Sequence, residues 1–199
     1  MDDSTRRALI IVDVQRDFCE GGALPVEGGF QVAEQIADYA RAHRNDFDLV
    51  ITTRDWHRGD NDNSGHFAVP GTQPDYRTTW PVHCVQGTDG ARYAPALEAI
   101  ADIVDDEILM GQGSPGYSGF SGRSPTGATL DQVLVAAGIA AVEVVGLATD
   151  FCVCATAVDA ARHGYAAAVP LDLCRSVSAD DTPAAIRRMR DAGVVVRPS

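Results

Sequence analysis

Two residues in this chain combine a reactive side chain with surroundings that would activate it. Cys152 lies in the segment GLATDFC, which is typical of a strand end, a tight turn and the start of a helix. A thiol at a helix N-terminus meets unpaired backbone N–H groups, which favour the thiolate and could hold an oxyanion. Asp13 directly follows the apolar run 8–12, where low-dielectric surroundings raise a carboxyl pKa towards a value useful for proton transfer. The alternatives are a structural cysteine and a loop aspartate that caps nearby backbone.

A second group of residues has the donor types of a metal site. It consists of one aspartate and three histidines in one stretch of chain: Asp55, His57, His66 and His83. Imidazole and carboxylate ligands together suit Zn, Fe(II) or Mn rather than Ca or Mg. Their spacing matches no compact zinc motif, so spacing alone leaves open whether a metal ion is held. Three aromatic residues could wall a pocket nearby or belong to the core: Phe18, Trp80 and Tyr117.

The elements that must position these residues alternate between apolar runs and longer amphipathic stretches. This pattern predicts βαβ units and an α/β fold with three layers, a mostly parallel central sheet with helices on both faces. We expect strands at 8–12, 49–53, 108–110, 142–147, 167–171 and 194–196. Helices are expected near 30–43, 129–137, 152–163 and 183–191. The length favours a single domain, residues 1–199.

Four residues fall at the carboxyl ends of predicted strands: Asp13, Asp55, Met110 and Ala148. In open α/β sheets, ligands bind outside these ends, at the point where the strand order reverses. The stretch 56–95 is rich in Gly, Pro, Asp, Asn and Thr and predicts a long loop, which in a compact domain usually has a function. We therefore expect the reactive residues and the metal-site candidates to meet at this edge.

The composition of the chain argues against two classes of binding partner, nucleic acids and membranes. A net charge of −12 argues against nucleic acid and anionic membranes. No apolar run reaches the roughly 20 residues of a membrane-spanning helix, and the first residues do not resemble a signal peptide. Five cysteines cannot all pair internally, so reduced thiols are expected. We expect a soluble cytoplasmic protein with a small-molecule partner; the sequence leaves its oligomeric state open, a homo-oligomer included.

Five segments in order along the chain carry a family resemblance. They are IIVDVQRDFCEGGAL, TTRDWH, DYRTTWPVHCVQGT, GYSGFSG and GLATDFCVCATA. Together they resemble the nicotinamidase/pyrazinamidase branch of the isochorismatase-like cysteine hydrolases, from about residue 8 to residue 197. The resemblance implies hydrolysis of nicotinamide, and of pyrazinamide-like amides, to the acid and ammonia through a cysteine thioester.

The resemblance also implies a role for each matching residue. Cys152 would be the nucleophile, and Asp13 would accept and return its proton. The peptide between Leu147 and Ala148 would be cis, with the amides of Ala148 and Cys152 forming the oxyanion hole. The metal ligands would be Asp55, His57, His66 and His83, holding one divalent ion (Zn, Fe or Mn) that orients the pyridine nitrogen. Phe18 and Trp80 would sandwich the ring, and Tyr117 lies in the matching aromatic segment.

One catalytic position departs from the family pattern. The third catalytic residue in the family is a lysine before a glycine, and this chain has Met110 there and no lysine at all. Arg54 and Arg123 are the nearest cations in sequence, but an arginine does not give up its proton. We therefore expect turnover reduced by about 10²–10⁴-fold, with the metal site and ring pocket retained. Phe151 stands where relatives often carry His or Tyr, a milder change of the pocket.

Two other functions stay open on this sequence. The protein could be a weak or silent family member that binds a nicotinamide-like ligand. It could also be an amidase for another small amide, such as an N-carbamoyl compound, although the metal quartet favours a pyridine ring. Whether Met110 was introduced or arose by natural divergence is likewise open.

Overall fold

Near-continuous apolar runs form the strands, because both faces of a parallel sheet are covered by helices. The computed structural model describes residues 5–198. Within them, seven strands form one sheet: β1 (Arg7–Val12), β2 (Leu49–Asp55), β3 (Asp106–Met110), β4 (Ala141–Leu147), β5 (Ala166–Pro170), β6 (Cys174–Arg175) and β7 (Val195–Arg197). All of them pair in parallel, in the order β3-β2-β1-β4-β5-β7, with β6 beside the end of β4.

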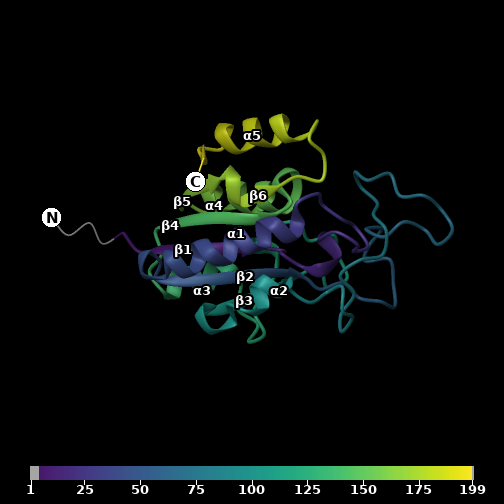
Figure 1. Ribbon diagram of the computed structural model, residues 1–199, viewed down its shortest axis with the longest axis horizontal. Coiled ribbons are helices and arrows are strands. Elements are labelled where there is room, and N and C mark those ends of the chain that lie inside the picture. Colours follow the sequence, from purple (N-terminus) through teal and green to yellow (C-terminus); the bar gives the residue numbers. More distant parts are fainter. Residues whose placement is uncertain (1–4, 199) are drawn as a thin grey trace.

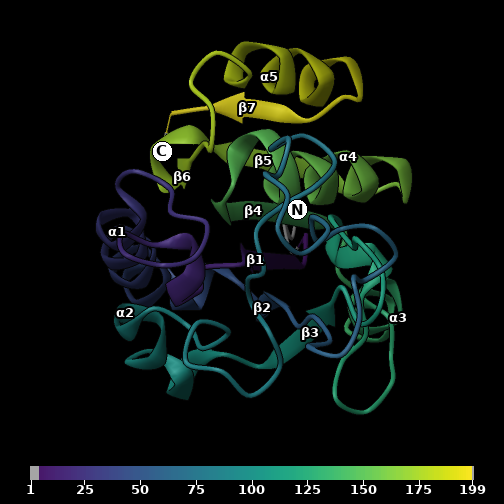
Figure 2. The same ribbon diagram turned by 90° about the vertical axis from the view of Figure 1, so that its right-hand side faces the viewer.

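Helices cover both faces of the sheet, as predicted. They are α1 (Gly29–Ala42), the short α2 (Pro95–Glu98), α3 (Leu130–Ala136), α4 (Cys154–Arg162) and α5 (Thr182–Asp191). Viewed along the strands, α1 and α2 lie on one side and α3 and α4 on the other (Figure 2). Alternate strand residues contribute to two hydrophobic cores, one on each face of the sheet. Leu9 and Ile11 pack with α1 and α2, while Ile10 and Val12 pack with α3, α4 and α5.

The predicted elements are confirmed, with ends that move by one or two residues. The helix expected from residue 152 begins at Cys154, after a π-helical turn over Thr149–Val153. Sequence patterning missed α2 and β6, because elements this short show no periodicity. In residues 5–198, no helix has the length and apolar character to cross a membrane.

The long loop after β2 gathers at one end of the molecule. Between β2 and α2 the chain makes isolated bridges but no further strand or helix, as the composition predicts. Figure 1 shows its blue and teal coils projecting beyond the sheet. Two bridges, His57 to Val85 and Phe67 to Trp80, fold this loop back on itself. The bridges bring distant parts of the loop side by side above the strand ends.

Candidate active site

The four predicted strand-end residues lie on neighbouring strands. Asp13 follows β1, Asp55 and Met110 are the last residues of β2 and β3, and Ala148 follows β4. These four strands are adjacent in the order β3-β2-β1-β4. Register pairs Asp55 directly with Met110. The regular geometry of a parallel sheet therefore brings together residues separated by more than a hundred positions.

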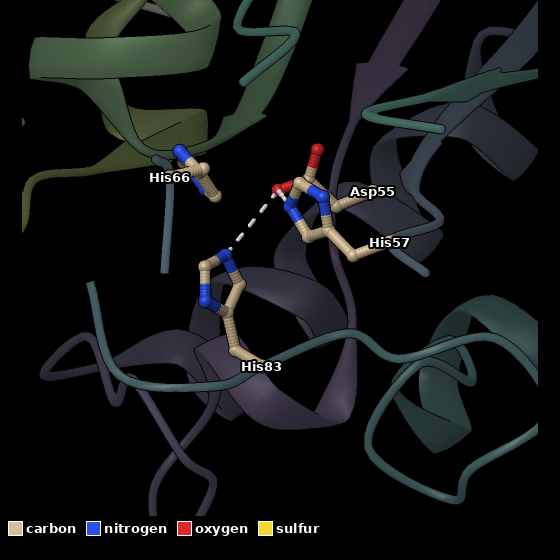
Figure 3. A group of neighbouring side chains, drawn as sticks. All are labelled: Asp55, His57, His66 and His83. Carbon is tan, nitrogen blue, oxygen red and sulfur yellow. Dashed lines mark ion pairs between the residues drawn. The ribbon is translucent and has the colours of Figure 1, made fainter. Parts of the chain in front are cut away.

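The metal-site candidates converge in a buried group. One ligand atom from each of the four side chains lies within 4.8 Å of all the others. Asp55 comes from the end of β2, and the three histidines come from the loop that follows, as Figure 3 shows. The Asp55 Oδ2 atom lies 3.3 Å from Nε2 of His57 and 3.6 Å from Nε2 of His83. The chain thus presents an aspartate and three imidazoles towards a common centre.

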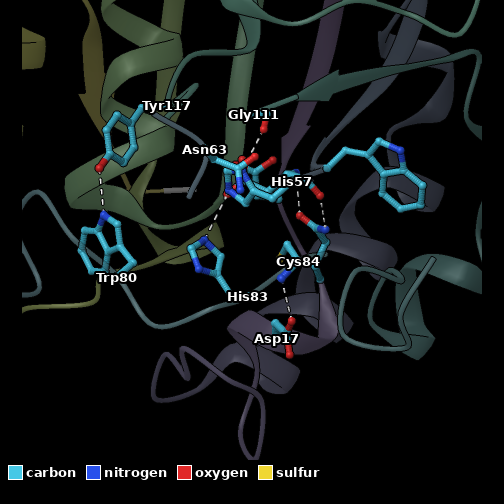
Figure 4. Close-up of polar contacts among 12 residues, drawn as sticks. Asp17, His57, Asn63, Trp80, His83, Cys84, Gly111 and Tyr117 are labelled. Carbon is cyan, nitrogen blue, oxygen red and sulfur yellow. Dashed lines mark hydrogen bonds and ion pairs between the residues drawn. The ribbon is translucent and has the colours of Figure 1, made fainter. Parts of the chain in front are cut away.

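The outer nitrogens of two histidines are already held by the backbone. Nδ1 of His57 donates to the carbonyl of Gly111 at 2.9 Å, and Nδ1 of His83 donates to the carbonyl of Pro81 at 2.7 Å. Figure 4 shows the first of these bonds. Such bonds fix the ring and its tautomer and leave Nε2 as the ligand atom.

Several inner atoms of the quartet lack a partner. In residues 5–198, Oδ1 of Asp55, Nε2 of His57 and both ring nitrogens of His66 are buried without a hydrogen bond. Buried polar atoms are normally satisfied, so this group fits a divalent metal ion that would take up their lone pairs. The donor set suits Zn, Fe(II) or Mn.

The shifted pKa values of Asp55 and His66 suit metal binding. Burial works against the charged form of Asp55, but the neighbouring His57 and His83 hold the pKa of Asp55 well below its usual range. Burial, together with the neighbouring His57 and His83, lowers the pKa of His66 to about 3. His66 is therefore neutral at physiological pH, as an imidazole ligand must be.

Gln15 is a site residue that sequence reasoning missed. Its side-chain Nε2 donates to the Asp55 carbonyl at 2.8 Å, and its Oε1 accepts from the Asp55 N–H at 2.8 Å. Nε2 also donates to the carbonyl of Ala91 at 3.1 Å. Gln15 therefore ties the backbone of a candidate metal ligand to the segment after β1.

Cys152 and Asp13 are buried together. Cys152 is 7% exposed and lies in the π-helical turn, while Asp13 is fully buried. Burial, reinforced by the Asp13 carboxylate, raises the pKa of the Cys152 thiol well above its usual range. Burial, and next the Asp55 carboxylate, raise the pKa of Asp13 in the same way. The expectation that the helix end favours a thiolate is therefore wrong for this chain, because desolvation and nearby carboxylates outweigh it.

Met110 occupies an apolar environment. It is 1% exposed and shares a core cluster with Val12, Ile108 and Cys152. The two arginines nearest in sequence are engaged elsewhere. Arg54 pairs with Glu107 at 2.8 Å and stacks over Trp56 and Tyr93, and Arg123 donates to the carbonyl of Gly127. Neither arginine takes the place of the lysine that the family resemblance leads one to expect.

A small apolar cavity lies between Cys152 and the quartet. Its walls include the three predicted aromatic residues and Phe151, which was expected to alter the pocket. Leu24, Leu147 and Val177 also line it and were not predicted as walls. Cys152, Asp55, His66 and His83 open onto the same space.

Hydrogen bonding and ring contacts fix these aromatic walls. Nε1 of Trp80 donates to the hydroxyl of Tyr117 at 2.8 Å, a bond visible in Figure 4. Phe151 meets Trp80 edge to face, with ring centroids 4.9 Å apart. The Trp80 and Tyr117 loops are far apart in sequence, so this bond joins two sides of the cavity. The walls are thus a defined surface, suited to a flat aromatic ligand.

The peptide between Leu147 and Ala148 is cis, as the resemblance implies. The carbonyl of Ala148 accepts from the N–H groups of Phe151 and Val153, both at 3.1 Å. These bonds hold the turn that carries Cys152. The role of the Ala148 and Cys152 amides as an oxyanion hole stays a prediction.

Zinc added to metal-free protein should raise its thermal unfolding midpoint by about 5–10 °C at a hundredfold excess over the dissociation constant. The reason is that the ion binds the native quartet and not the unfolded chain. His66→Ala should lose most of this shift, whereas His43→Ala should keep it, because His43 is an exposed residue paired with Asp46. Differential scanning fluorimetry with metal analysis measures both, and equal shifts in the two variants would contradict the site.

Comparison with known proteins gives consistent matches along nearly the whole chain. The isochorismatase domain family matches residues 7–199. A nicotinamidase/pyrazinamidase from Mycobacterium tuberculosis is 47% identical over 188 residues, which cover 94% of this chain and 96% of that protein.

Solved structures resemble this one in fold. Pyrazinamidase of Pyrococcus horikoshii in complex with zinc has a TM-score of 0.78 and 34% identity, covering 98% of this chain and 99% of that one. PnC1 from L. infantum in complex with nicotinate has a TM-score of 0.81 and 33% identity, covering 98% of this chain and 93% of that one. One of these relatives is thus known with zinc and the other with a pyridine carboxylate.

Proposed function

Because this chain belongs to the isochorismatase family, we propose that it hydrolyses nicotinamide, and pyrazinamide-like amides, to the acid and ammonia through a thioester on Cys152. The observation that carries the proposal is one cavity shared by Cys152, three members of the metal-site quartet and three aromatic walls; the quartet members are Asp55, His66 and His83. A nucleophile, a site for a ring nitrogen and a surface for a flat ring are what such an amide requires.

Binding would rest on the aromatic walls and the quartet. Phe18 and Trp80 would hold the two faces of the ring, with Tyr117 fixed beside them by its bond to Trp80. The quartet would hold one divalent ion, which when bound supplies an electron-pair acceptor for the ring nitrogen. The zinc complex of the Pyrococcus horikoshii relative supports a metal at this place, and the donor set admits Zn, Fe or Mn.

Proton transfer would pass between Asp13 and Cys152. The carboxylate takes the proton from Sγ as the sulfur attacks the amide carbon, and the amides of Ala148 and Cys152 receive the oxyanion. The same proton then passes from Asp13 to the amide nitrogen, the C–N bond breaks and ammonia leaves. Asp13 then takes a proton from water, whose oxygen attacks the thioester carbon. The C–S bond breaks, the acid leaves, and Asp13 returns the proton to Sγ of Cys152.

Met110 would make this cycle slow. Ionised Asp13 and a Cys152 thiolate both need positive charge nearby, and Met110 supplies none. The pKa values of both groups are raised, so burial works against both ionised forms. Substrate binding should survive, since the cavity walls and the quartet do not depend on residue 110.

The direct test measures ammonia release from nicotinamide, pyrazinamide, benzamide and an N-carbamoyl amino acid, with metal content determined. Nicotinamide and pyrazinamide should be hydrolysed fastest. Benzamide lacks the ring nitrogen and should be at least about tenfold poorer in kcat/KM, the size of one lost polar contact. Faster cleavage of the N-carbamoyl compound would favour the other amidase. If both this protein and its Met110→Lys variant bind nicotinamide but release no ammonia, a silent binder would be favoured.

A further inference from the structure

Thr53 forms two hydrogen bonds with Asp13, although Thr53 is neither a nucleophile nor a candidate metal ligand. We propose that Thr53 is a positioning residue: it occupies one oxygen of the Asp13 carboxyl and leaves the other, Oδ2, as the atom that exchanges the proton with Cys152. The inference rests on the proposed function, because it specifies how the proposed base works.

Strand geometry places Thr53 beside Asp13. Thr53 is fully buried on β2, two residues before Asp55, so its side chain points to the same face of the strand. Its hydroxyl donates to Oδ1 of Asp13 at 2.6 Å. The N–H of Asp13 in turn approaches the Thr53 hydroxyl oxygen and the Thr53 carbonyl, each at 3.3 Å. Side chain and backbone of Asp13 are thus both held by one residue.

The direction of these bonds decides which oxygen of Asp13 can carry a proton. A threonine hydroxyl has one proton to donate, whereas a backbone N–H can only donate. Because the Asp13 N–H points at the hydroxyl oxygen, the hydroxyl proton is free to point at Oδ1. Oδ1 is then an acceptor, and a proton arriving at the carboxyl goes to Oδ2.

The other oxygen has no competing partner. In residues 5–198, Oδ2 is buried and has no hydrogen-bond partner. The Cys152 thiol interacts with the Asp13 carboxyl, and because Thr53 occupies Oδ1, we assign this interaction to Oδ2. Asp13 also has φ of 50°, a region that non-glycine residues seldom adopt, and its bonds to Thr53 hold the backbone there.

The proton balance is then explicit. The Sγ–H bond of Cys152 breaks and an Oδ2–H bond forms on Asp13, while the sulfur electron pair attacks the amide carbon. Oδ2–H later gives the same proton to the departing nitrogen. Thr53 exchanges no proton, and its bond to Oδ1 persists throughout. Met110, at the end of β3, cannot donate a hydrogen bond. Thr53 is then the only O–H or N–H side chain bonded to the Asp13 carboxyl in the part of the chain the structure describes.

Three variants test the role of the hydroxyl. Thr53→Val removes it at nearly constant shape, Thr53→Ser restores it, and Thr52→Val is the matched control. Thr52 is the buried neighbour on the opposite face, and its hydroxyl is hydrogen-bonded to the Tyr93 hydroxyl at 2.8 Å, so its variant also loses a buried hydrogen bond. We expect Thr53→Val to lower kcat for ammonia release about tenfold, the size of a hydrogen bond to a charged group, with KM changed less than about twofold. Thr53→Ser should stay within about threefold of the parent, and Thr52→Val within about twofold.

A second readout needs no amide substrate. The rate of Cys152 alkylation by iodoacetamide, followed by peptide mass mapping, should fall in the same order and by a similar factor. The proposal would be overturned if Thr53→Val left kcat and the alkylation rate unchanged. It would also be overturned if Thr53→Ser were as slow as Thr53→Val, or if Thr52→Val lost as much activity as Thr53→Val. The alkylation rates can follow the expected order, with Thr53→Val slowest, while no amide is cleaved even in a Met110→Lys background. In that case the positioning role stands and the proposed function fails.

Discussion

Met110→Lys should raise kcat/KM for nicotinamide by about 10²–10⁴-fold, the contribution usual for a positioned proton-transfer group. Met110 is 1% exposed, and its neighbours include Cys152. A cation there favours the ionised forms of both Asp13 and Cys152. Two opposite unit charges roughly 4 Å apart attract by about 4 kcal/mol at an effective dielectric near 20, enough to offset much of the desolvation of both groups. Lysine is close to methionine in length, so the fold should accept it.

Met110→Leu is the matched control for this experiment. It keeps the residue apolar at similar volume and should leave the slow activity unchanged within a few-fold. Steady-state ammonia release is measured for parent and both variants, with equal metal loading and thermal unfolding recorded. A Met110→Lys protein that folds, binds metal and is no faster than Met110→Leu would show that position 110 does not limit the reaction.

Cys152→Ala, made in the Met110→Lys background, should remove at least about 10⁴-fold of the activity, because no other group can form the thioester. The faster background leaves room to measure so large a loss. Binding of nicotinate should persist, since the aromatic walls and the quartet are untouched. Rapid quenching of the Met110→Lys protein with nicotinamide should trap an acyl group on the Cys152 peptide in mass spectra.

Cys154→Ala provides the control within the same segment. Cys154 is buried two residues further on, and its thiol donates to the carbonyl of Ala185 rather than facing the cavity. This variant should lose stability but keep turnover per folded molecule within about threefold. Equal losses in the two variants would assign the effect to folding, and residual activity in Cys152→Ala would point to direct attack by water.

Local patterns sufficed to predict the framework of the site. Apolar runs bounded by polar residues located the main strands, and parallel pairing then required Asp13, Asp55, Met110 and Ala148 to meet at one edge. Side-chain chemistry named the donors of the quartet. The absence of lysine is a fact of the sequence and needs no structure.

The loop contacts could not be read from the sequence. His66 and His83 reach Asp55 only because non-local bridges fold an aperiodic segment back on itself. Gln15 and Thr53 act through hydrogen bonds to residues about 40 positions away, which no local pattern encodes. The walls formed by Leu24 and Val177 likewise depend on how distant segments pack.

The difference between what the sequence determines and what the tertiary structure decides is clearest for the electrostatics of the site. The sequence by itself determined which groups are present, namely a thiol, a carboxyl, four metal-type donors and no lysine. Only the tertiary structure decided that Arg54 turns to Glu107, that Met110 sits in an apolar cluster, and that the Cys152 pKa is raised rather than lowered. The physical reason is that charge energies depend on burial and on neighbours brought together by folding, whereas strand periodicity depends on adjacent residues.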